Sequence, residues 1–117
     1  TLSSSSAASD VYKRQVYNLV ENAIKYNRFG GQVTVTAYRK GKNICLSVED
    51  TGSGIPDELK ERVFEPFFRV DKSRSRELGG VGLGLALVRE IVRVHDGSIT
   101  VHSGSSGGTV FDVVFTQ

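Results

Sequence analysis

The chain has few of the residues that carry covalent or membrane-spanning structure. Its 117 residues include one cysteine, two prolines, no tryptophan and no methionine. Cys45 alone cannot form an intrachain disulfide, and its place in a strand pattern indicates a packed core thiol rather than a nucleophile or a ligand. No apolar run approaches the ~20 residues that a membrane-spanning helix needs, and no signal peptide is visible. The net charge of +2 is too small to indicate a nucleic-acid-binding surface.

The absence of methionine bears on the beginning of the chain. Because the sequence starts with Thr1 and contains no methionine, we expect a fragment of a longer protein. Residues 1–10 are rich in serine and alanine and cannot build a core, which is typical of a flexible tail. The segment through Gln15 resembles a translated sequencing adapter. We therefore predict a flexible, non-native tail over residues 1–15 and one domain over residues 16–117.

From Val16 onward the apolar residues follow a helical period. The predicted apolar face consists of Val16, Leu19, Val20, Ala23 and Ile24. Asn18 and Asn22 stand one turn apart, so two amides point the same way from one helix, and Lys25 follows near the next turn. A lone helical asparagine is usually a solvent-facing residue. Two of them beside an apolar stripe, followed by a lysine, favour a binding site.

Two alternating patterns predict an antiparallel hairpin over residues 33–49, which leads into Asp50-Thr51-Gly52-Ser53-Gly54. A carboxylate at a strand end suits an exocyclic amine donor such as the adenine amino group. The glycines would let a flat ring lie close to the backbone. The same pattern also fits an ordinary loop and is weak evidence alone. Beyond it, Asp57 is expected to cap a short helix, and a second hairpin is expected over residues 99–115.

A glycine-rich stretch at residues 79–84 stands between a cationic loop and a strong helix pattern. The loop, residues 70–79, lacks periodicity, and ~12 structureless residues in a compact domain usually indicate a lid or binding loop. Its cations could close on phosphates. The helix predicted over residues 83–95 would present unpaired N–H groups at its start, where the helix dipole favours an anion. The junction therefore predicts a phosphate site.

The order of these elements predicts the fold class. It is an α/β (α+β) two-layer sandwich with an antiparallel-dominated mixed sheet and helices on one face. A P-loop would need a Gly-x-x-x-x-Gly-Lys-Ser/Thr motif, which is absent. A dinucleotide fingerprint would need Gly-x-Gly-x-x-Gly after a parallel strand, whereas Gly80, Gly82 and Gly84 are spaced by two and follow a loop. Both common nucleotide-binding folds are therefore poor fits.

Four motifs together resemble the catalytic ATP-binding domain of sensor histidine kinases, which belongs to the gyrase, heat-shock chaperone, histidine kinase and MutL (GHKL, Bergerat-fold) superfamily. The matches are an N box at residues 18–27 (NLVENAIKYN), a first glycine box at 50–54 (DTGSG), an F box at 64–69 (FEPFFR) and a second glycine box at 80–85 (GVGLGL). The four in order, at the expected separations, are far more specific than any one of them. The resemblance runs from Val16 to the C-terminus.

The resemblance implies a site for ATP and Mg²⁺. Asn18 and Asn22 would hold Mg²⁺ and phosphate oxygens, and Asp50 would accept a hydrogen bond from the adenine N6. Lys25 and Arg69 would complete the catalytic set by binding phosphate. The other residues implied at the nucleotide are Tyr26, Gly52, Gly54, Ile55, Phe68, Arg74, Gly80, Gly82, Leu83, Gly84, Leu85 and Thr109. For the turn at residues 107–109, the residues alone allow either a hydroxyl near the site or simple turn chemistry, and we favour the turn.

The resemblance also implies the reaction, which is transfer of the γ-phosphoryl to a histidine on a separate dimerisation domain. Neither His95 nor His102 is followed by the acidic residue typical of that acceptor, so the acceptor is expected outside this fragment. ATP-hydrolysing relatives carry a glutamate where Asn18 stands, and a neutral amide cannot act as their general base. Two alternatives stay open: another protein of the same fold, such as an anti-sigma serine kinase or an ATPase, and a non-catalytic nucleotide-binding or interaction module.

The parent protein implied by the resemblance is a homodimeric, membrane-anchored bacterial sensor with this domain in the cytoplasm. A response regulator receiver domain would be its indirect partner, and no nucleic acid partner is expected. Family members have further residues before the N box, including a strand pair. We therefore expect an N-terminally truncated domain that is less stable than an intact one.

Overall fold

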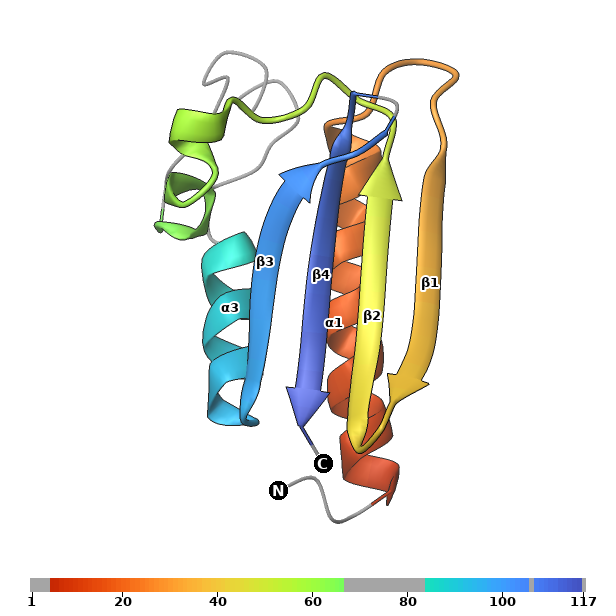
Figure 1. Ribbon diagram of the computed structural model, residues 1–117, viewed down its shortest axis with the longest axis vertical. Coiled ribbons are helices and arrows are strands. Elements are labelled where there is room, and N and C mark those ends of the chain that lie inside the picture. Colours follow the sequence, from red (N-terminus) through yellow and green to blue (C-terminus); the bar gives the residue numbers. More distant parts are fainter. Residues whose placement is uncertain (1–4, 67–83, 106, 117) are drawn as a thin grey trace.

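The computed structural model describes residues 5–66, 84–105 and 107–116, and they form two layers, a sheet and helices on one of its faces (Figure 1). The helices are α1 (Ser5–Lys25) and α3 (Gly84–Val94), with two 3₁₀ helices, η1 (Asp57–Leu59) and η2 (Arg62–Phe64). The strands are β1 (Val33–Lys40), β2 (Asn43–Asp50), β3 (Gly97–Ser103) and β4 (Thr109–Thr116). None of the described helices has the length and apolar character needed to cross a membrane.

The four strands lie in the order β1-β2-β4-β3, and each neighbouring pair is antiparallel. This confirms the predicted sandwich with an antiparallel-dominated sheet and helices on one face. The parallel pair that a mixed sheet would add is not among the described strands. Both predicted hairpins are present, as the strand pairs β1–β2 and β3–β4. The central pair, β2 with β4, joins strands that are far apart in the sequence.

Helix α1 begins earlier than the periodicity predicted. It starts at Ser5 rather than near Val16, so residues 5–15 are helical and the expected flexible tail is wrong for them. Gln15 is 1% exposed and continues the buried row of Leu19 and Ala23 against the sheet. The helix ends at Lys25, close to the predicted end. The non-native origin of residues 1–15 stays a prediction.

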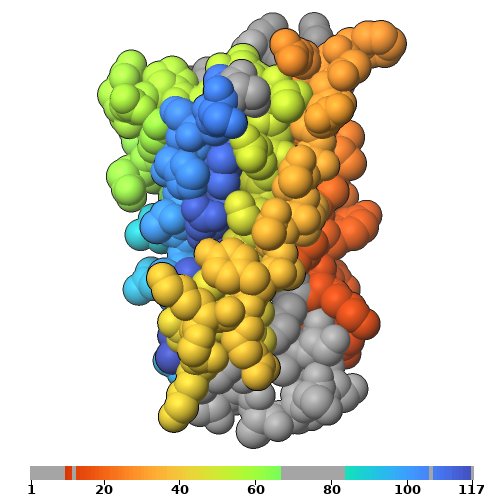
Figure 2. All heavy atoms as spheres, turned by 45° about the vertical axis from the view of Figure 1, so that its right-hand side comes forward, coloured from red at the N-terminus to blue at the C-terminus, as the bar shows by residue number. Residues whose placement is uncertain are grey.

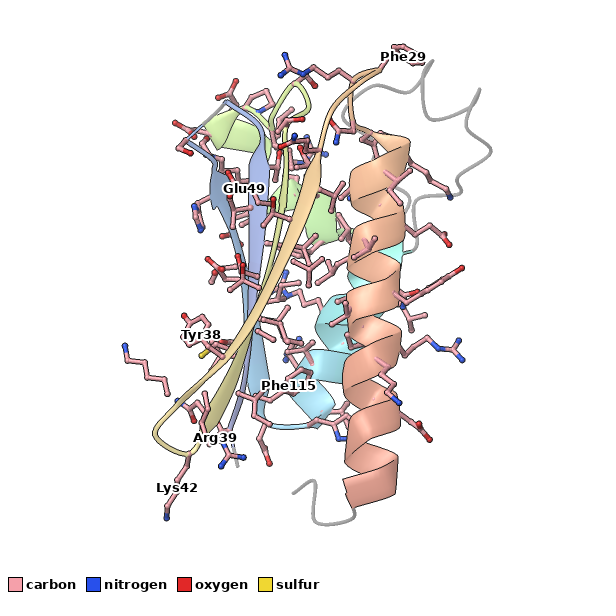
Figure 3. All side chains as sticks on the ribbon, turned by 90° about the vertical axis from the view of Figure 1, so that its right-hand side faces the viewer. Phe29, Tyr38, Arg39, Lys42, Glu49 and Phe115 are labelled. Carbon is pink, nitrogen blue, oxygen red and sulfur yellow. The ribbon has the colours of Figure 1, made fainter. Side chains whose placement is uncertain are left out.

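The core lies between the sheet and the two helices. Val48, Val113 and Phe115 on the central strands are fully buried, and Figure 3 shows Phe115 pointing from the sheet toward α1. Cys45 is buried with a free thiol, as predicted. β1 is an edge strand, along which every residue after Val33 is exposed, and it runs along the surface in Figure 2. The helices therefore pack mainly on β2, β4 and β3.

Helix α3 buries a narrow part of its apolar surface. Val88 and Val92 have no exposed surface, whereas the apolar side chains of Leu87 and Val94 are 55% and 69% exposed. Ile24 on α1 is likewise 63% exposed rather than buried. In each helix, buried residues spaced by four face the sheet. Residues about 100° further around the helix axis point too far to the side to pack on the sheet.

Two aromatic rings and one arginine attach η2 to the rest of the fold. The Phe64 ring meets Phe111 of β4 edge to face, with centroids 6.1 Å apart. The guanidinium of Arg89 on α3 lies 5.4 Å from the centroid of Phe64. Phe64, the first residue of the F-box match, is therefore a packing residue that joins η2 to β4 and α3.

The short helix expected after Asp57 is present as two 3₁₀ turns, and its predicted cap is wrong. Pro56 stands at the N-cap of η1 and makes no side-chain cap. The Asp57 carboxylate instead pairs with Lys60, which lowers the pKa of Asp57 through that hydrogen bond. The Lys60 ammonium also donates to Ser103 Oγ at 2.9 Å, which ties this turn to the end of β3.

Candidate nucleotide-binding site

Three segments meet at one end of the sheet, the upper end in Figure 1: the end of α1, the loop after β2, and the β3–β4 turn. Glycines allow their backbones to approach closely. A Cβ at Gly52 would lie 2.7 Å from the Tyr26 carbonyl oxygen, and a Cβ at Gly54 would lie 2.7 Å from the Gly107 carbonyl oxygen. A Cβ at Gly108 would lie 2.0 Å from the Asp50 carbonyl oxygen. No larger residue fits these places without moving the backbone.

Asp50, at the end of β2, is the carboxylate on which these segments converge. Asp50 is buried, with 7% of its surface exposed. Its Oδ1 accepts two backbone hydrogen bonds, from Gly52 N–H at 2.9 Å and from Thr109 N–H at 3.3 Å. Within the part of the chain that the structure describes, Oδ2 has no hydrogen-bond partner. One oxygen therefore fixes the carboxylate, and the other is available to accept from a ligand.

Asn18 and Asn22 both lie on α1 and are half-buried. Their side chains make no hydrogen bond to another described residue, so both amide oxygens are available as acceptors. Lys25 is one turn from Asn22, as predicted, and its Nζ lies 3.7 Å from Glu21 Oε1. This pair is partly exposed, and such pairs contribute only ~0.3–0.5 kcal/mol, so a phosphate could displace the glutamate at little cost.

The remaining predicted residues in the described segments play different parts. Ile55 and Leu85 are partly buried and pack against the core. Gly84 is the exposed first residue of α3. Thr109 is buried and contributes its N–H to Asp50, which supports turn chemistry over a hydroxyl at the site. Tyr26 follows α1 and is half-buried.

Six predicted site residues lie outside the described residues: Phe68, Arg69, Arg74, Gly80, Gly82 and Leu83. The cationic loop at residues 70–79 lies outside them as well. The described part of the predicted site therefore consists of the α1 amides and lysine, the Asp50 loop, the start of α3 and the turn at Thr109.

Sequence reasoning missed the residues that connect the end of α1 to the end of β2. The side chains of Asn27 and Thr51 meet there, with Thr51 Oγ1 3.2 Å from Asn27 Oδ1, and both bond to the backbone of Gln32. Gly108 was also missed as a packing partner of Asp50. Asn27 stands inside the N-box match and Thr51 inside the first glycine box, but neither motif reveals that they touch.

A second polar pair lies apart from this site. His102 Nε2 is 2.6 Å from Asp112 Oδ2, and His102 Nδ1 is 3.2 Å from the Ser103 carbonyl oxygen. The Asp112 hydrogen bond, helped by the Ser103 carbonyl, raises the pKa of His102. Asp112 alternates with the buried Phe111 and Val113, so this pair lies on the sheet face that points away from the helices.

Comparisons with known proteins agree with this geometry. The family model described as histidine kinase-, DNA gyrase B-, and HSP90-like ATPase matches residues 8–117. The sensor-like histidine kinase SenX3 of Mycobacterium tuberculosis is 51% identical over 94 residues, which cover 80% of this chain and 23% of SenX3. The solved mycobacterial sensor histidine kinase MprB matches with a TM-score of 0.80 and 34% identity, over 92% of this chain and 73% of that one.

One neighbour was solved together with a partner. The histidine kinase ThkA, in complex with the response regulator protein TrrA, matches with a TM-score of 0.71 and 31% identity, over 90% of this chain and 28% of that chain. The chain spans about a quarter of the length of the curated relatives it matches. The fold, the converging site and these likenesses agree: the chain belongs to the histidine kinase-, DNA gyrase B- and HSP90-like ATPase family, and matches the catalytic ATP-binding domain of sensor histidine kinases within it.

Proposed function

We propose that this chain binds Mg-ATP and holds the γ-phosphoryl for transfer to a histidine on a dimerisation domain outside the chain. The observation that carries the proposal is that the two carboxylate oxygens of Asp50 have different roles. Two backbone N–H groups hold Oδ1, so the direction of Oδ2 is set before any ligand arrives. An ionised carboxylate only accepts hydrogen bonds, and the exocyclic amine of adenine only donates them. Oδ2 therefore suits adenine.

The phosphate end of the site would lie along α1 and at the start of α3. Mg²⁺ prefers oxygen ligands, and the amide oxygens of Asn18 and Asn22, one turn apart, have no hydrogen-bond partner within the described segments. The donor set therefore fits the ion, which would neutralise charge on the phosphates. Lys25 would turn from Glu21 to a phosphate oxygen. The N–H groups at the start of α3, beginning at Gly84, would add donors together with the positive end of the helix dipole.

The reaction that follows is an in-line phosphoryl transfer. The imidazole nitrogen of the acceptor histidine would attack the γ-phosphorus, and the bond from that phosphorus to the β–γ bridging oxygen would break, with ADP as the leaving group. Such transfer depends on positioning and charge neutralisation more than on covalent help from the protein. Asn18 supports transfer over hydrolysis, because a neutral amide cannot take a proton from water.

The surroundings of the domain follow from its relatives. The ThkA neighbour was solved with a response regulator, which supports a receiver domain as the eventual phosphoryl acceptor in the pathway of this protein. The relatives are named sensor kinases, which supports a membrane-anchored, homodimeric parent with this domain in the cytoplasm. We include the dimerisation domain, the membrane anchor and Mg²⁺ in this proposal.

The Asp50→Asn variant tests the adenine end. Its amide oxygen can keep the two backbone hydrogen bonds, while its NH₂ group would replace Oδ2 and face the adenine amine, donor against donor. We expect the affinity for the Mg²⁺ complex of the non-hydrolysable ATP analogue AMPPNP to fall by ~30-fold or more, because a mismatched polar pair leaves both groups unbonded. Isothermal titration calorimetry measures this.

Asp112→Asn is the matched control, since it makes the same chemical change on the opposite face of the sheet. Its affinity for Mg-AMPPNP should equal that of the wild type. An Asp50→Asn variant that keeps its thermal midpoint and binds as tightly as the wild type would refute the assignment of Asp50.

A further inference from the structure

Asn27, Gln32 and Thr51 form a closed set of hydrogen bonds between three segments of the chain. Thr51 Oγ1 donates to Asn27 Oδ1 at 3.2 Å and accepts from Gln32 N–H at 2.9 Å. Asn27 Nδ2 donates to the Gln32 carbonyl at 2.9 Å, and Thr51 N–H donates to the same carbonyl at 3.2 Å. The set links the residue after Asp50 to a residue two positions beyond α1.

The donors and acceptors in this set fit in one arrangement. Arg28 N–H donates to Asn27 Oδ1 at 2.8 Å, so that oxygen already faces a group that can only donate. A flipped Asn27 amide would place its NH₂ against this N–H. The Thr51 hydroxyl has one hydrogen, which goes to Asn27, because its other neighbour is the Gln32 N–H. Each group therefore fixes the next.

The set is also packed too closely to admit another side chain. A Cβ on Gly31 would lie 2.3 Å from Asn27 Oδ1 and 2.7 Å from Thr51 Oγ1. The close approach requires glycine at this position. The hydrogen bonds therefore connect the end of α1 directly to the end of β2, and a larger residue at position 31 would have to displace the Asn27 and Thr51 side chains.

The proposed ligand makes the separation of α1 and β2 important. ATP has adenine at one end and phosphates at the other. In the proposed site, the end of β2 binds adenine and α1 binds the phosphates. Both ends can be bound at once only when the two elements are correctly spaced. Asn27 follows Lys25 closely along the chain, and Thr51 is the neighbour of Asp50, so their contact joins the two halves of the site.

We infer that Asn27 and Thr51 are positioning residues that set the spacing between the adenine-reading carboxylate and the phosphate-binding helix. The inference rests on the proposed function. It goes beyond the assignment of Asp50, Asn18 and Asn22, because neither Asn27 nor Thr51 is expected to touch the nucleotide. Their contact affects how well the adenine and the phosphates of one ATP molecule are bound at the same time.

Thr51→Val tests the inference, because valine keeps the shape of threonine and removes the hydroxyl from both of its bonds. The affinity for Mg-AMPPNP should fall about threefold to tenfold, as expected for the loss of an ordinary hydrogen bond or two. The affinity for adenosine, followed by NMR chemical-shift titration, should change less than twofold, since adenosine needs only the Asp50 end. Thr51→Ser keeps the hydroxyl and should restore Mg-AMPPNP binding.

Asn27→Ala provides a second route to the same contact. It should weaken Mg-AMPPNP binding to a similar extent, and the double variant with Thr51→Val should be no weaker than the worse single variant, because the two side chains act as one unit. Thermal unfolding of each variant precedes the titrations. If both single variants fail to fold, the contact serves folding and the positioning role is overturned.

Three other results would overturn the inference. These are unchanged Mg-AMPPNP affinity in a folded Thr51→Val protein, an equal loss of adenosine and Mg-AMPPNP affinity, and no rescue by Thr51→Ser. A wild-type chain that binds no Mg-AMPPNP would instead overturn the proposed function itself, and the inference with it. The wild-type titration thus separates the two failures.

Discussion

Asp50 is held by backbone groups that come from different parts of the chain. Gly52 follows it by two residues, and Thr109 is 59 residues away. Hydrogen bonds from N–H groups to an ionised carboxylate are stronger than neutral ones, so the carboxylate is fixed without the use of another side chain. This arrangement leaves one oxygen for a ligand, and it explains why Gly108 must approach the Asp50 backbone so closely.

His102 carries the clearest pH-dependent interaction in the described residues. Its two ring nitrogens face the Asp112 carboxylate and the Ser103 carbonyl, which are both acceptors, so the doubly protonated ring suits the place. The hydrogen bond to Asp112 is the largest cause that raises the pKa of His102. Burial and the nearby Lys60 ammonium oppose it. Asp112 and Lys60 are the charged groups that act on the ring.

The raised pKa predicts the sign of a pH effect. The unfolded histidine titrates near ~6.5, and a folded pKa above that value means that the folded protein binds the proton more tightly. The contribution to stability is fully present below pH ~6.5 and is lost as the pH rises through the folded pKa. We expect the thermal midpoint to fall as the pH rises above ~6.5 through the folded pKa of His102, and His102→Gln to remove this part of the slope.

The control for this measurement is His95→Gln, which leaves the pair with Asp112 intact. It should keep the pH dependence of the wild type. A slope that persists unchanged in His102→Gln, or disappears in His95→Gln, would show that the His102 pair is not its source. The His102 ring is largely exposed, so the effect should weaken as salt concentration increases.

The residues that could be predicted from the sequence are those whose type alone suits the ligand. Asn18 and Asn22 are polar residues beside the apolar stripe of a predicted helix, and Asp50 is a carboxylate at the end of a predicted strand. Asn27 and Thr51 act on each other across 24 residues, and Thr109 reaches Asp50 across 59. Such partnerships depend on how the chain folds back on itself, which a spacing pattern does not contain.

At the scale of elements, both helices bury a stripe rather than a broad face. On α3 the buried residues are Val88 and Val92, and on α1 they are Gln15, Leu19 and Ala23. Periodicity predicted the helices and their centres, because both contribute an apolar row to one core. It overestimated the width of each face, since an apolar side chain such as Leu87 or Ile24 can remain exposed at small cost.

The start of α1 is an element boundary that the sequence pattern predicted wrongly. Residues 5–10 belong to the serine- and alanine-rich stretch, yet residues 5–15 are part of helix α1. Gln15 is buried in the apolar row, and its Oε1 has no hydrogen-bond partner among the residues that the structure describes. A buried unpaired acceptor costs ~1–3 kcal/mol, so this position weakens the helix that it extends.

The first residue of α3 separates folding from nucleotide binding. A Cβ on Gly84 would meet no atom within 4 Å, so the fold tolerates alanine there. Alanine is the better helix former, by up to ~1 kcal/mol in a helix interior, so the thermal midpoint of Gly84→Ala should stay equal or rise slightly. The affinity for Mg-AMPPNP should nevertheless fall several-fold, because the added methyl group obstructs the approach of a phosphate to the helix start.

Arg93→Ala, at the other end of α3, is the control for Gly84→Ala and should leave the nucleotide affinity unchanged. Calorimetric titration and thermal unfolding of both variants provide the comparison. If Gly84→Ala binds Mg-AMPPNP as tightly as the wild type, the glycine belongs to an ordinary turn before a core helix, and the helix start is not a phosphate site.

At the scale of the whole molecule, the two halves of the proposed site lie on elements of different kinds. The asparagines stand on a helix that packs on the sheet, and the carboxylate stands at the end of a central strand. Both elements are anchored by core packing, which is the arrangement that keeps a binding geometry precise. The sequence order predicted this sandwich because each hairpin and each helix has its own local pattern.

The end of the sheet at Asp50 is proposed to bind an adenine nucleotide. The most direct test compares the non-hydrolysable analogues of ATP and GTP, each with Mg²⁺, in calorimetric titrations of the whole chain. Guanine carries a carbonyl acceptor where adenine carries the amine, and it would face the Asp50 carboxylate, acceptor against acceptor. We predict that the ATP analogue binds and that the GTP analogue binds at least ~30-fold more weakly. Equal affinity for the two analogues, or no binding of either, would contradict the account.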